Sequence, residues 1–357
     1  MMRFFLILVL AANALAEQPL GAPLAAPNRA AVCQQLLLPN APRRAAAILR
    51  LRCDGADAYR DFRAALDRAQ ITALATLRQK LPLVKPGDPQ IAALRKASAD
   101  YKAAVAKALP LVQTDHRKDK NKLAAMDRAF DAAEKAHVHL MQKLKPGSVA
   151  PIVQILDAAQ WVAEIRRDQS WCDGAGTDAS KLDLVAALTA EGASEEIKTL
   201  TSELEPIISL REFHRYIIAA NAALRWAKIE QAEYAEILNA RRVVLGLRPQ
   251  LLSERLSAAA AQHSEEMMKL RYFAHESPVP QNKTHANRAT NAKFEGQPYG
   301  ECIFMGAPSP KDAHTAWWYS DGHRLILYTN GKTAQGGARA GSTHWTFMNG
   351  DLTKFPF

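Results

Sequence analysis

Two histidines and a glutamate in the last third of the chain have side chains that could together bind a metal ion. They are His275, Glu301 and His323. Two neutral imidazoles and one carboxylate supply three ligands and leave a fourth position open, which is the arrangement of an exchangeable or reactive zinc site. A calcium site built from oxygen ligands requires more carboxylates, so zinc is the expected cation and calcium the less favoured one.

Each of these residues also has an ordinary structural interpretation. His275 can stabilise a turn, and His323 can lie near a helix C-terminus, where the helix dipole favours a protonated imidazole. Glu301 can form a salt bridge with Arg288 or Arg324. The residue types alone leave these alternatives open.

A serine hydrolase is the less favoured chemistry for this region. Ser277 lies two residues after His275, but a Ser-His pair also needs an orienting acid and an oxyanion hole. The sequence contains no Gly-x-Ser-x-Gly nucleophile elbow. His263 lies within a predicted helix and is interpreted as structural. The aromatic residues Trp317, Trp318, Trp345 and Phe347 are expected in the core.

Alternating helical and strand patterns surround the candidate residues. A helix is predicted from Ile237 to Gly246, because glycine adopts the left-handed C-terminal conformation cheaply. A second apolar stripe includes Leu256 and Met267, and a third helix begins at Ser309 with proline in its first turn. Short β-rich runs are predicted at 325–329, 336–340 and 343–348, with Asn330-Gly331 as a hairpin turn.

The order of these segments resembles the bacterial branch of the CAP family, a group of secreted proteins. The resemblance covers about a third of the chain and rests on five short segments taken together. They are Leu238 to Pro249, Ala260 to Ser264, Phe273 to Pro278, Gly300 to Ile303, and Trp317 to Arg324.

The resemblance implies an α-β-α sandwich with a cleft lined by two histidines and two acidic residues. Family members can hold a divalent metal, often zinc or calcium, in this cleft. His275, Glu301 and His323 match three of the four positions, and the fourth falls on Asp321. Cys302 replaces the asparagine that usually follows the glutamate, which places a thiol beside the expected cleft.

The first residues have the features of a secretory signal. Arg3 precedes the apolar run Phe4 to Ala12, and Ala14-Leu15-Ala16 is a small-x-small cleavage site. The apolar run is short for a membrane span, and no second candidate follows. We therefore expect a protein exported to the periplasm or the extracellular space, with no transmembrane segment in the mature chain.

The expected fold class is α+β, with an all-helical N-terminal region before the CAP-type sandwich. Helical spacing of apolar residues, such as Tyr59, Phe62 and Leu66, runs through most of the first two thirds. The expected segments are a signal peptide at 1–16, a flexible leader at 17–28, a helical domain at 29–172, a helical connector at 173–230 and the CAP domain at 231–357.

Four cysteines in an exported chain permit disulfides. Cys33 and Cys53 flank one short helical stretch and form the favoured pair, which leaves Cys172 with Cys302. The spacing does not match a zinc ribbon, so thiolate metal binding is not expected.

The chain carries a formal net charge of +10 and a pI of about 9.4. Basic exported proteins are attracted to anionic surfaces such as lipid head groups or cell-wall polymers. The densest basic run, 116–122, contains no aromatic residue, whereas single-stranded nucleic acid binding combines basic and stacking residues. Nucleic acid is therefore not an expected partner.

The favoured function is a non-enzymatic binding module that takes a lipid, metal, cell-surface or cell-wall ligand through the CAP cleft. One alternative is an envelope scaffold that depends on the helical region. The other is a zinc-dependent hydrolase that uses the cleft, because zinc lowers the pKa of a bound water to about 7.

Overall fold

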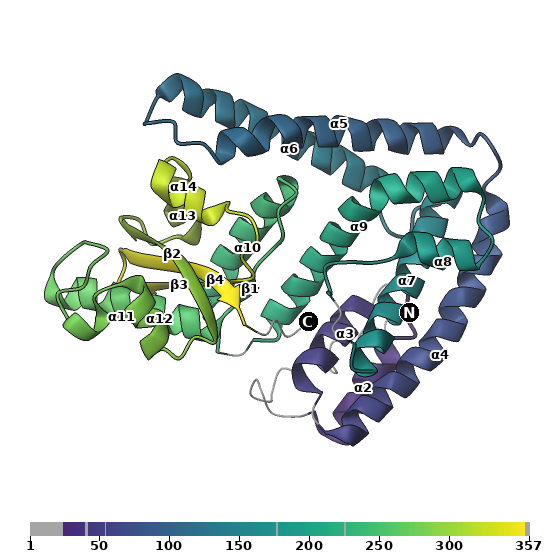
Figure 1. Ribbon diagram of the computed structural model, residues 1–357, viewed down its shortest axis with the longest axis horizontal. Coiled ribbons are helices and arrows are strands. Elements are labelled where there is room, and N and C mark those ends of the chain that lie inside the picture. The colour runs from purple at the N-terminus through teal and green to yellow at the C-terminus, as the bar shows by residue number, and fades with distance from the viewer. Residues whose placement is uncertain (1–23, 40–41, 54, 176–177, 225, 354–357) are drawn as a thin grey trace, which may run out of the picture. The chain divides into compact units, whose positions relative to one another are not determined.

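The computed structural model describes residues 24–39, 42–53, 55–175, 178–224 and 226–353. The predicted signal peptide and most of the leader lie outside these residues. The chain forms two compact units, here called the helical unit (1–101, 136–225 and 356–357) and the sheet unit (102–135 and 226–355). The expected α+β class is confirmed (Figure 1). In the described parts of the chain, no helix is long and apolar enough to cross a membrane.

The helical unit is built from helices alone in its described residues. Its elements are α2 (Ala26–Gln35), α3 (Pro42–Arg52), α4 (Ala56–Lys80), η1 (Leu81–Leu83), the first part of α5 (Pro89–Val112), the last part of α6 (Lys120–Lys143), α7 (Pro151–Cys172), α8 (Leu184–Ala190) and α9 (Glu195–Ala222). Helix α7 is buried along most of its length and packs against α4, while α9 packs against α3.

Buried ion pairs join α3 and α9 within the helical unit. Glu212, on α9, forms ion pairs with Arg43, Arg211 and Arg215. Burial raises the pKa of the Glu212 carboxyl, but the charges of Arg211 and Arg43 outweigh it, so the pKa lies below its ordinary value. Asp168 on α7 likewise lies 2.9 Å from a guanidinium nitrogen of Arg50. The carboxylates therefore neutralise the buried guanidinium groups of Arg43 and Arg50.

The sheet unit contains a four-stranded sheet with the order β1-β3-β4-β2. Strand β1 pairs parallel with β3, and the other pairs are antiparallel. Its elements outside α5 and α6 are α10 (Ile229–Val244), β1 (Leu251–Leu252), α11 (Glu254–Leu270), η2 (Pro280–Asn282), α12 (His285–Asn291), β2 (Gly296–Met305), α13 (Pro310–Trp318), α14 (Asp321–Leu327), β3 (Ala334–Ala340) and β4 (His344–Leu352).

Helices cover both faces of this sheet. Figure 1 shows α11 and α12 on one side and α13 and α14 on the other. Side chains alternate along β4, because successive residues of a strand point to opposite faces. Trp345 and Phe347 join the core under α10 and α13, whereas Met348 packs with Leu256 of α11. This is the three-layered arrangement that the resemblance implies.

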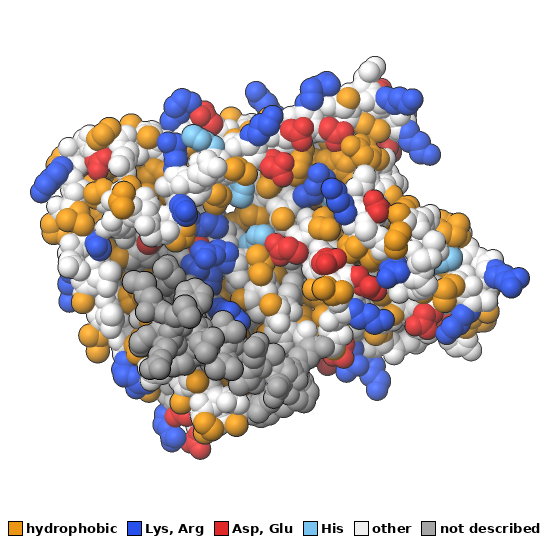
Figure 2. All heavy atoms as spheres, turned by 180° about the vertical axis from the view of Figure 1, so that it is seen from behind, with side chains coloured by type: hydrophobic (Ala, Val, Ile, Leu, Met, Phe, Trp, Pro, Cys, Tyr) orange, Lys and Arg blue, Asp and Glu red, His pale blue; other side chains and the backbone are white. Residues whose placement is uncertain are grey.

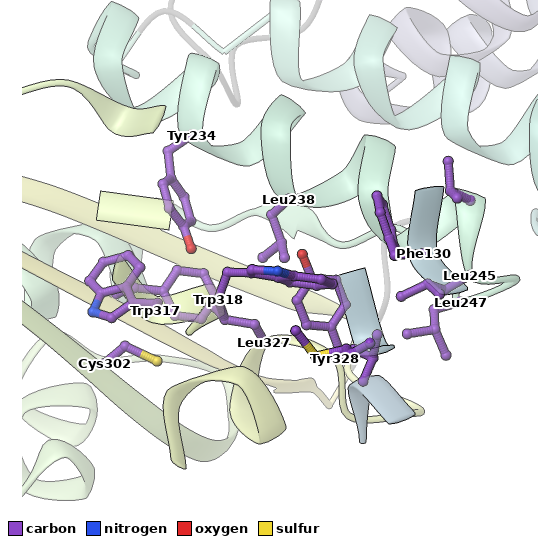
Figure 3. Packing of buried hydrophobic residues seen from close by; sticks show 14 of the residues in the cluster. Phe130, Tyr234, Leu238, Leu245, Leu247, Cys302, Trp317, Trp318, Leu327 and Tyr328 are labelled. Carbon is purple, nitrogen blue, oxygen red and sulfur yellow. The ribbon is translucent and has the colours of Figure 1, made fainter. Parts of the chain in front are cut away.

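Residues 102–135, the ends of α5 and α6 with their connecting loop, belong to the sheet unit. Phe130 of α6 lies 5.2 Å from the ring of Trp318, edge to face, and both pack in one buried cluster (Figure 3). Asp127 accepts a hydrogen bond from the Trp318 indole at 2.8 Å. The units are therefore not the contiguous domains 29–172 and 231–357 that we expected, because apolar residues of α5 and α6 complete the core around α13.

One predicted strand is wrong. Residues 325–327 belong to α14, so Asn330-Gly331 does not join two strands of a hairpin. The buried side chains of Arg324 and Leu327 lie one turn apart on this helix, and the Tyr328 amide donates to the carbonyl of Arg324. The apolar run at 325–328 is thus the last turn of a short helix and its C-cap, in which Leu327 and Tyr328 are buried.

Neither predicted disulfide forms. Cys33, Cys53, Cys172 and Cys302, all of them described residues, form no disulfide bond. Cys302 is fully buried on β2, where its thiol donates to the carbonyl of His323 at 3.8 Å. Burial, with the charges of Asp168 and Cys53, raises the pKa of Cys172 to about 12. The short spacing of Cys33 and Cys53 in the sequence therefore does not correspond to a disulfide between them.

The buried His314 makes stability depend on pH. It lies on α13 with Nε2 2.8 Å from the Tyr328 hydroxyl, and burial, with the charge of Arg241, lowers its pKa to about 3. The unfolded chain binds a proton at this histidine near pH 6.5, but the folded chain does so only near pH 3. Stability is therefore lost as pH falls through this interval, by up to about 1.4 kcal/mol per pH unit for this group.

Urea unfolding at pH 7 and pH 5 measures this effect. We expect the free energy of unfolding to fall more steeply with acid in the wild type than in His314→Gln, which cannot titrate there. Equal pH dependence in the two proteins would contradict the assignment.

Candidate functional site

Three of the four predicted site residues come together on the sheet unit. His275 lies in the turn after α11, Glu301 on β2 and His323 on α14. The Nδ1 atom of His275 is 3.0 Å from a carboxylate oxygen of Glu301, and the ring centroids of His275 and His323 are 5.9 Å apart. The side chain of His275 is half exposed, so the group opens to solvent.

Glu301 is a buried carboxylate, with 5% of its surface exposed, held from two sides. One oxygen accepts a hydrogen bond from His275 Nδ1, and the other pairs with the guanidinium of the fully buried Arg288. Burial raises the pKa of Glu301, but the hydrogen bond from His275 and the charge of Arg288 outweigh it, so the pKa lies below its ordinary value. The salt bridge with Arg288, which the sequence left open, is present.

Arg288 also fixes the turn that carries His275. Its guanidinium donates to the backbone carbonyl of His275 at 3.1 Å and to that of Asn282 at 2.6 Å. One buried arginine therefore ties the site carboxylate to the backbone of the site histidine. Breaking one partner of such a buried pair is strongly destabilising.

His263, on α11, supports the site from behind. Its Nε2 donates to the carbonyl of Ala274 at 3.1 Å and lies 3.7 Å from Glu301, while its Nδ1 faces the Tyr272 hydroxyl at 3.3 Å. Burial lowers its pKa, so the ring is neutral near pH 7. The structural role that the sequence indicated fits this geometry.

His323 presents an imidazole nitrogen that has no partner. Its Nδ1 is buried and makes no hydrogen bond within the residues that the structure describes. Burial, with the charge of His275, lowers the pKa of His323 to about 4. The ring is therefore neutral near pH 7 and keeps a lone pair available to a cation.

Asp321, the fourth predicted residue, faces another direction. Two residues of an α-helix differ in direction by about 200°, so Asp321 and His323 lie on opposite sides of α14. Asp321 pairs with the buried Arg324 and accepts the backbone N–H of Lys118 at 3.2 Å. Burial raises its pKa, but these hydrogen bonds outweigh it and lower the pKa to about 2. Asp321 anchors the loop between α5 and α6 and does not join His275.

The serine beside the site serves a structural purpose. Ser277 is buried, and its hydroxyl donates to Glu266 at 2.7 Å and accepts the backbone N–H of Val279 at 3.0 Å. The Ser277 hydroxyl therefore bonds Glu266 and does not form a Ser-His pair with His275.

Sequence reasoning missed His285, the first residue of α12. Burial lowers its pKa, the charge of Glu301 opposes this, and the charges of Arg288 and His275 add to it. The available signal was its spacing of three residues from Arg288, which places the two side chains on one face of a helix.

The ligand set for a metal differs from the one expected. Among the described residues, no group of three or more His, Cys, Asp and Glu side chains is arranged to hold a metal ion. Both oxygens of Glu301 are engaged by His275 and Arg288. The residues present fit a cation held by the two imidazoles, with Glu301 orienting His275 as carboxylates orient metal-binding histidines elsewhere.

The sequence of this part of the chain matches known proteins. The family model of the cysteine-rich secretory protein family, CAP, matches residues 235–352. "Uncharacterized protein YkwD" of Bacillus subtilis (strain 168) is 34% identical over 97 residues, which are 26% of this chain and 36% of that protein. A crystal structure of an extracellular protein containing an SCP domain, from Bacillus anthracis strain Ames, is 21% identical with a TM-score of 0.33, over 38% of this chain and 43% of that chain.

Residues 235–352 are therefore a CAP domain, and the resemblance seen in the sequence is confirmed. The chain spans about a third of the length of the curated relative that it matches. The residues before 235 lie outside the family model. The family gives this part of the chain its class and does not name a ligand.

The Lys and Arg side chains do not gather in one patch on the face that Figure 2 shows. On the face of the described residues that Figure 2 shows, Lys and Arg side chains are spread over the surface and interspersed with Asp and Glu. An anionic surface remains a candidate partner on net charge alone. The grouping of His275, Glu301 and His323 supports a function more specifically than the net charge does.

Proposed function

We propose that this protein is an exported, non-enzymatic binding module whose CAP cleft takes a divalent metal ion, zinc before calcium, through His275 and His323. The observation that supports it is the unpartnered, buried Nδ1 of His323 beside the ring of His275. Zinc accepts imidazole nitrogen readily, whereas calcium requires several oxygen ligands.

Glu301 would set the tautomer of His275. A carboxylate accepts only, so the Nδ1 atom of His275 donates and its Nε2 keeps the lone pair. When bound, zinc would act as a Lewis acid at the mouth of the cleft.

Two protein ligands leave further positions on the cation for an external group. A lipid head group, a cell-surface group or a cell-wall group with oxygen or nitrogen donors could complete the coordination. We favour binding over hydrolysis, because both oxygens of Glu301 are already engaged and the carboxylate is not free to act as a base. Export to the periplasm or the extracellular space is part of the proposal and rests on the features of residues 1–16.

Zinc content and zinc affinity of the purified mature protein test the proposal. We expect about one zinc per chain by elemental mass spectrometry, and loss of it in both His275→Ala and His323→Ala. His139→Ala, an exposed histidine on α6, is the matched control and should keep its zinc. Zinc that stays in both cleft variants, or is absent from every sample after zinc is added, would contradict the metal site.

Glu301→Gln separates the orienting role from a ligand role. It keeps the size of the side chain and removes the charge, so we expect zinc affinity to fall about 10- to 100-fold without loss of stoichiometry. A chelator-sensitive turnover on a peptide or ester would favour the hydrolase instead. Unchanged cellular function after deletion of 231–357 would favour the scaffold.

A further inference from the structure

A groove on the sheet unit lies apart from His275, Glu301 and His323. It is formed where the start of α10, the first turns of α11 and strand β3 meet, and it has a volume of about 170 Å³. Its lining residues are Trp226, Lys228, Glu230, Gln231, Glu254, Ser257, Ala258, Ala261, Ala338 and Arg339. None of these is a residue of the proposed metal site.

Small side chains make the floor of the groove. Helix α11 lies so close to β3 that a Cβ atom at Gly336 would be 2.3 Å from the backbone nitrogen of Ser257. Ala258, Ala261 and Ala338 line the space beside this contact. Since none of them reaches beyond a methyl group, the indole of Trp226 is the one large apolar lining group.

Ser257 lines the groove with a hydroxyl that has no partner. The residue is 3% exposed, and its Oγ makes no hydrogen bond in the described part of the chain. The amide of Gln231, which also lines the groove, bonds elsewhere: its nitrogen donates to the carbonyl of Gly337 and its oxygen accepts the backbone N–H of Lys228. Buried hydroxyls are nearly always hydrogen-bonded, so this group calls for a ligand or a water.

The charged residues at the groove largely balance each other. Arg339 pairs with Glu230 at 3.2 Å and also donates to the carbonyl of Gly341, while Lys228 and Glu254 carry opposite charges. The groove therefore selects shape and one hydrogen bond more than it selects a net charge.

We infer that this groove binds a small aromatic molecule that carries one hydrogen-bonding group, of the size of a phenol or an indole. The volume equals roughly five or six water molecules, at about 30 Å³ each, which suits a single ring. Flat aromatic groups stack on indole with a gain beyond area burial. The Ser257 hydroxyl would bond the polar group of the ligand.

Titration of the 15N-labelled full mature chain with p-cresol tests the inference, with toluene as the probe that lacks the hydroxyl. We expect the Trp226 indole N–H resonance, assigned with Trp226→Phe, to shift with a dissociation constant on the order of a millimolar. Ser257→Ala should weaken p-cresol binding about 3- to 10-fold and leave toluene binding unchanged.

Filling the groove should abolish binding of both probes. Ala261→Leu places a larger side chain at a half-buried position of the groove. Ala258→Leu does so at an exposed position of the same helix, where the larger side chain does not enter the core. Ala240→Leu, an exposed alanine on α10 outside the groove, is the control and should bind as the wild type does.

Three outcomes would overturn the inference. The first is a Trp226 resonance that does not shift, as expected if water alone bonds Ser257. The second is binding that survives both groove-filling variants. The third is an equal effect of Ser257→Ala on p-cresol and toluene binding. His275→Ala should leave p-cresol binding unchanged, which separates this result from that of the zinc experiment.

Discussion

Replacing Glu212 by glutamine is expected to destabilise the helical unit by about 3–5 kcal/mol. Glu212 is buried on α9 and is the shared counter-ion of Arg43, Arg211 and Arg215. Its loss leaves positive charge in a medium that solvates it poorly, and removal of one partner from a buried ion pair costs this much. Urea or thermal unfolding measured by circular dichroism gives the change in free energy.

Glu195→Gln is the matched control on the same helix. Glu195 pairs with Lys198, but its side chain is 87% exposed, so the pair should contribute less than about 1 kcal/mol. A loss for Glu212→Gln as small as that of the control would show that water reaches the arginines and that the ion pairs are not buried.

The order of segments in the sequence predicted the centre of the site. His275, Glu301 and His323 lie in different elements, yet His275 Nδ1 is 3.0 Å from Glu301 and the ring centroids of the two histidines are 5.9 Å apart. Each of these residues lies in a short segment that resembles the family, which is the signal that grouped them in the sequence.

The prediction for Asp321 failed for a local reason. The helix that carries Trp317 and Trp318 ends at Trp318, and a new helix begins at Asp321. Periodicity alone did not show this break. The start of α14 sets the direction of each side chain on that helix. Asp321 therefore pairs with Arg324, and His323 lies beside His275.

The packing of residues 102–135 on the CAP domain could not be read from the sequence. The apolar spacing of Met126, Phe130 and Ala133 predicts a buried helix face, but it does not say which surface covers that face. The partners of this face, including Trp318 and Leu245, lie more than a hundred residues later in the chain. Amphipathic patterns report that a face is buried, whereas the choice of partner depends on the complementary shapes of both surfaces.

This packing makes the helical segment part of the support of α14, the helix that carries His323. Arg324, which is fully buried, donates to the carbonyls of Val112 and Thr114 and to Asp321. The end of α5 therefore fixes the helix that presents His323. A CAP domain cut at residue 231 would lose these contacts.

Replacing Phe130 by alanine should accordingly destabilise the sheet unit by about 3–5 kcal/mol, although Phe130 lies a hundred residues before the CAP domain. The ring is buried in the core, lies against Trp318 and carries the guanidinium of Arg241 at 4.5 Å. Its removal leaves a cavity at the point where α6 meets α13. Near-ultraviolet circular dichroism, which reports the buried tryptophans, follows the unfolding of this unit.

Val138→Ala on the same helix is the control, because Val138 is 47% exposed and the change should cost less than about 0.5 kcal/mol. Zinc affinity measured beside stability adds a second reading of Phe130→Ala, since a loosened α6 also loosens α14 and His323. Unfolding of the sheet unit at the wild-type urea midpoint would show that residues 102–135 rest on the CAP domain without stabilising it. A shifted midpoint with weaker zinc binding would establish that the helical segment and the CAP domain fold as one structure and that the cleft depends on both.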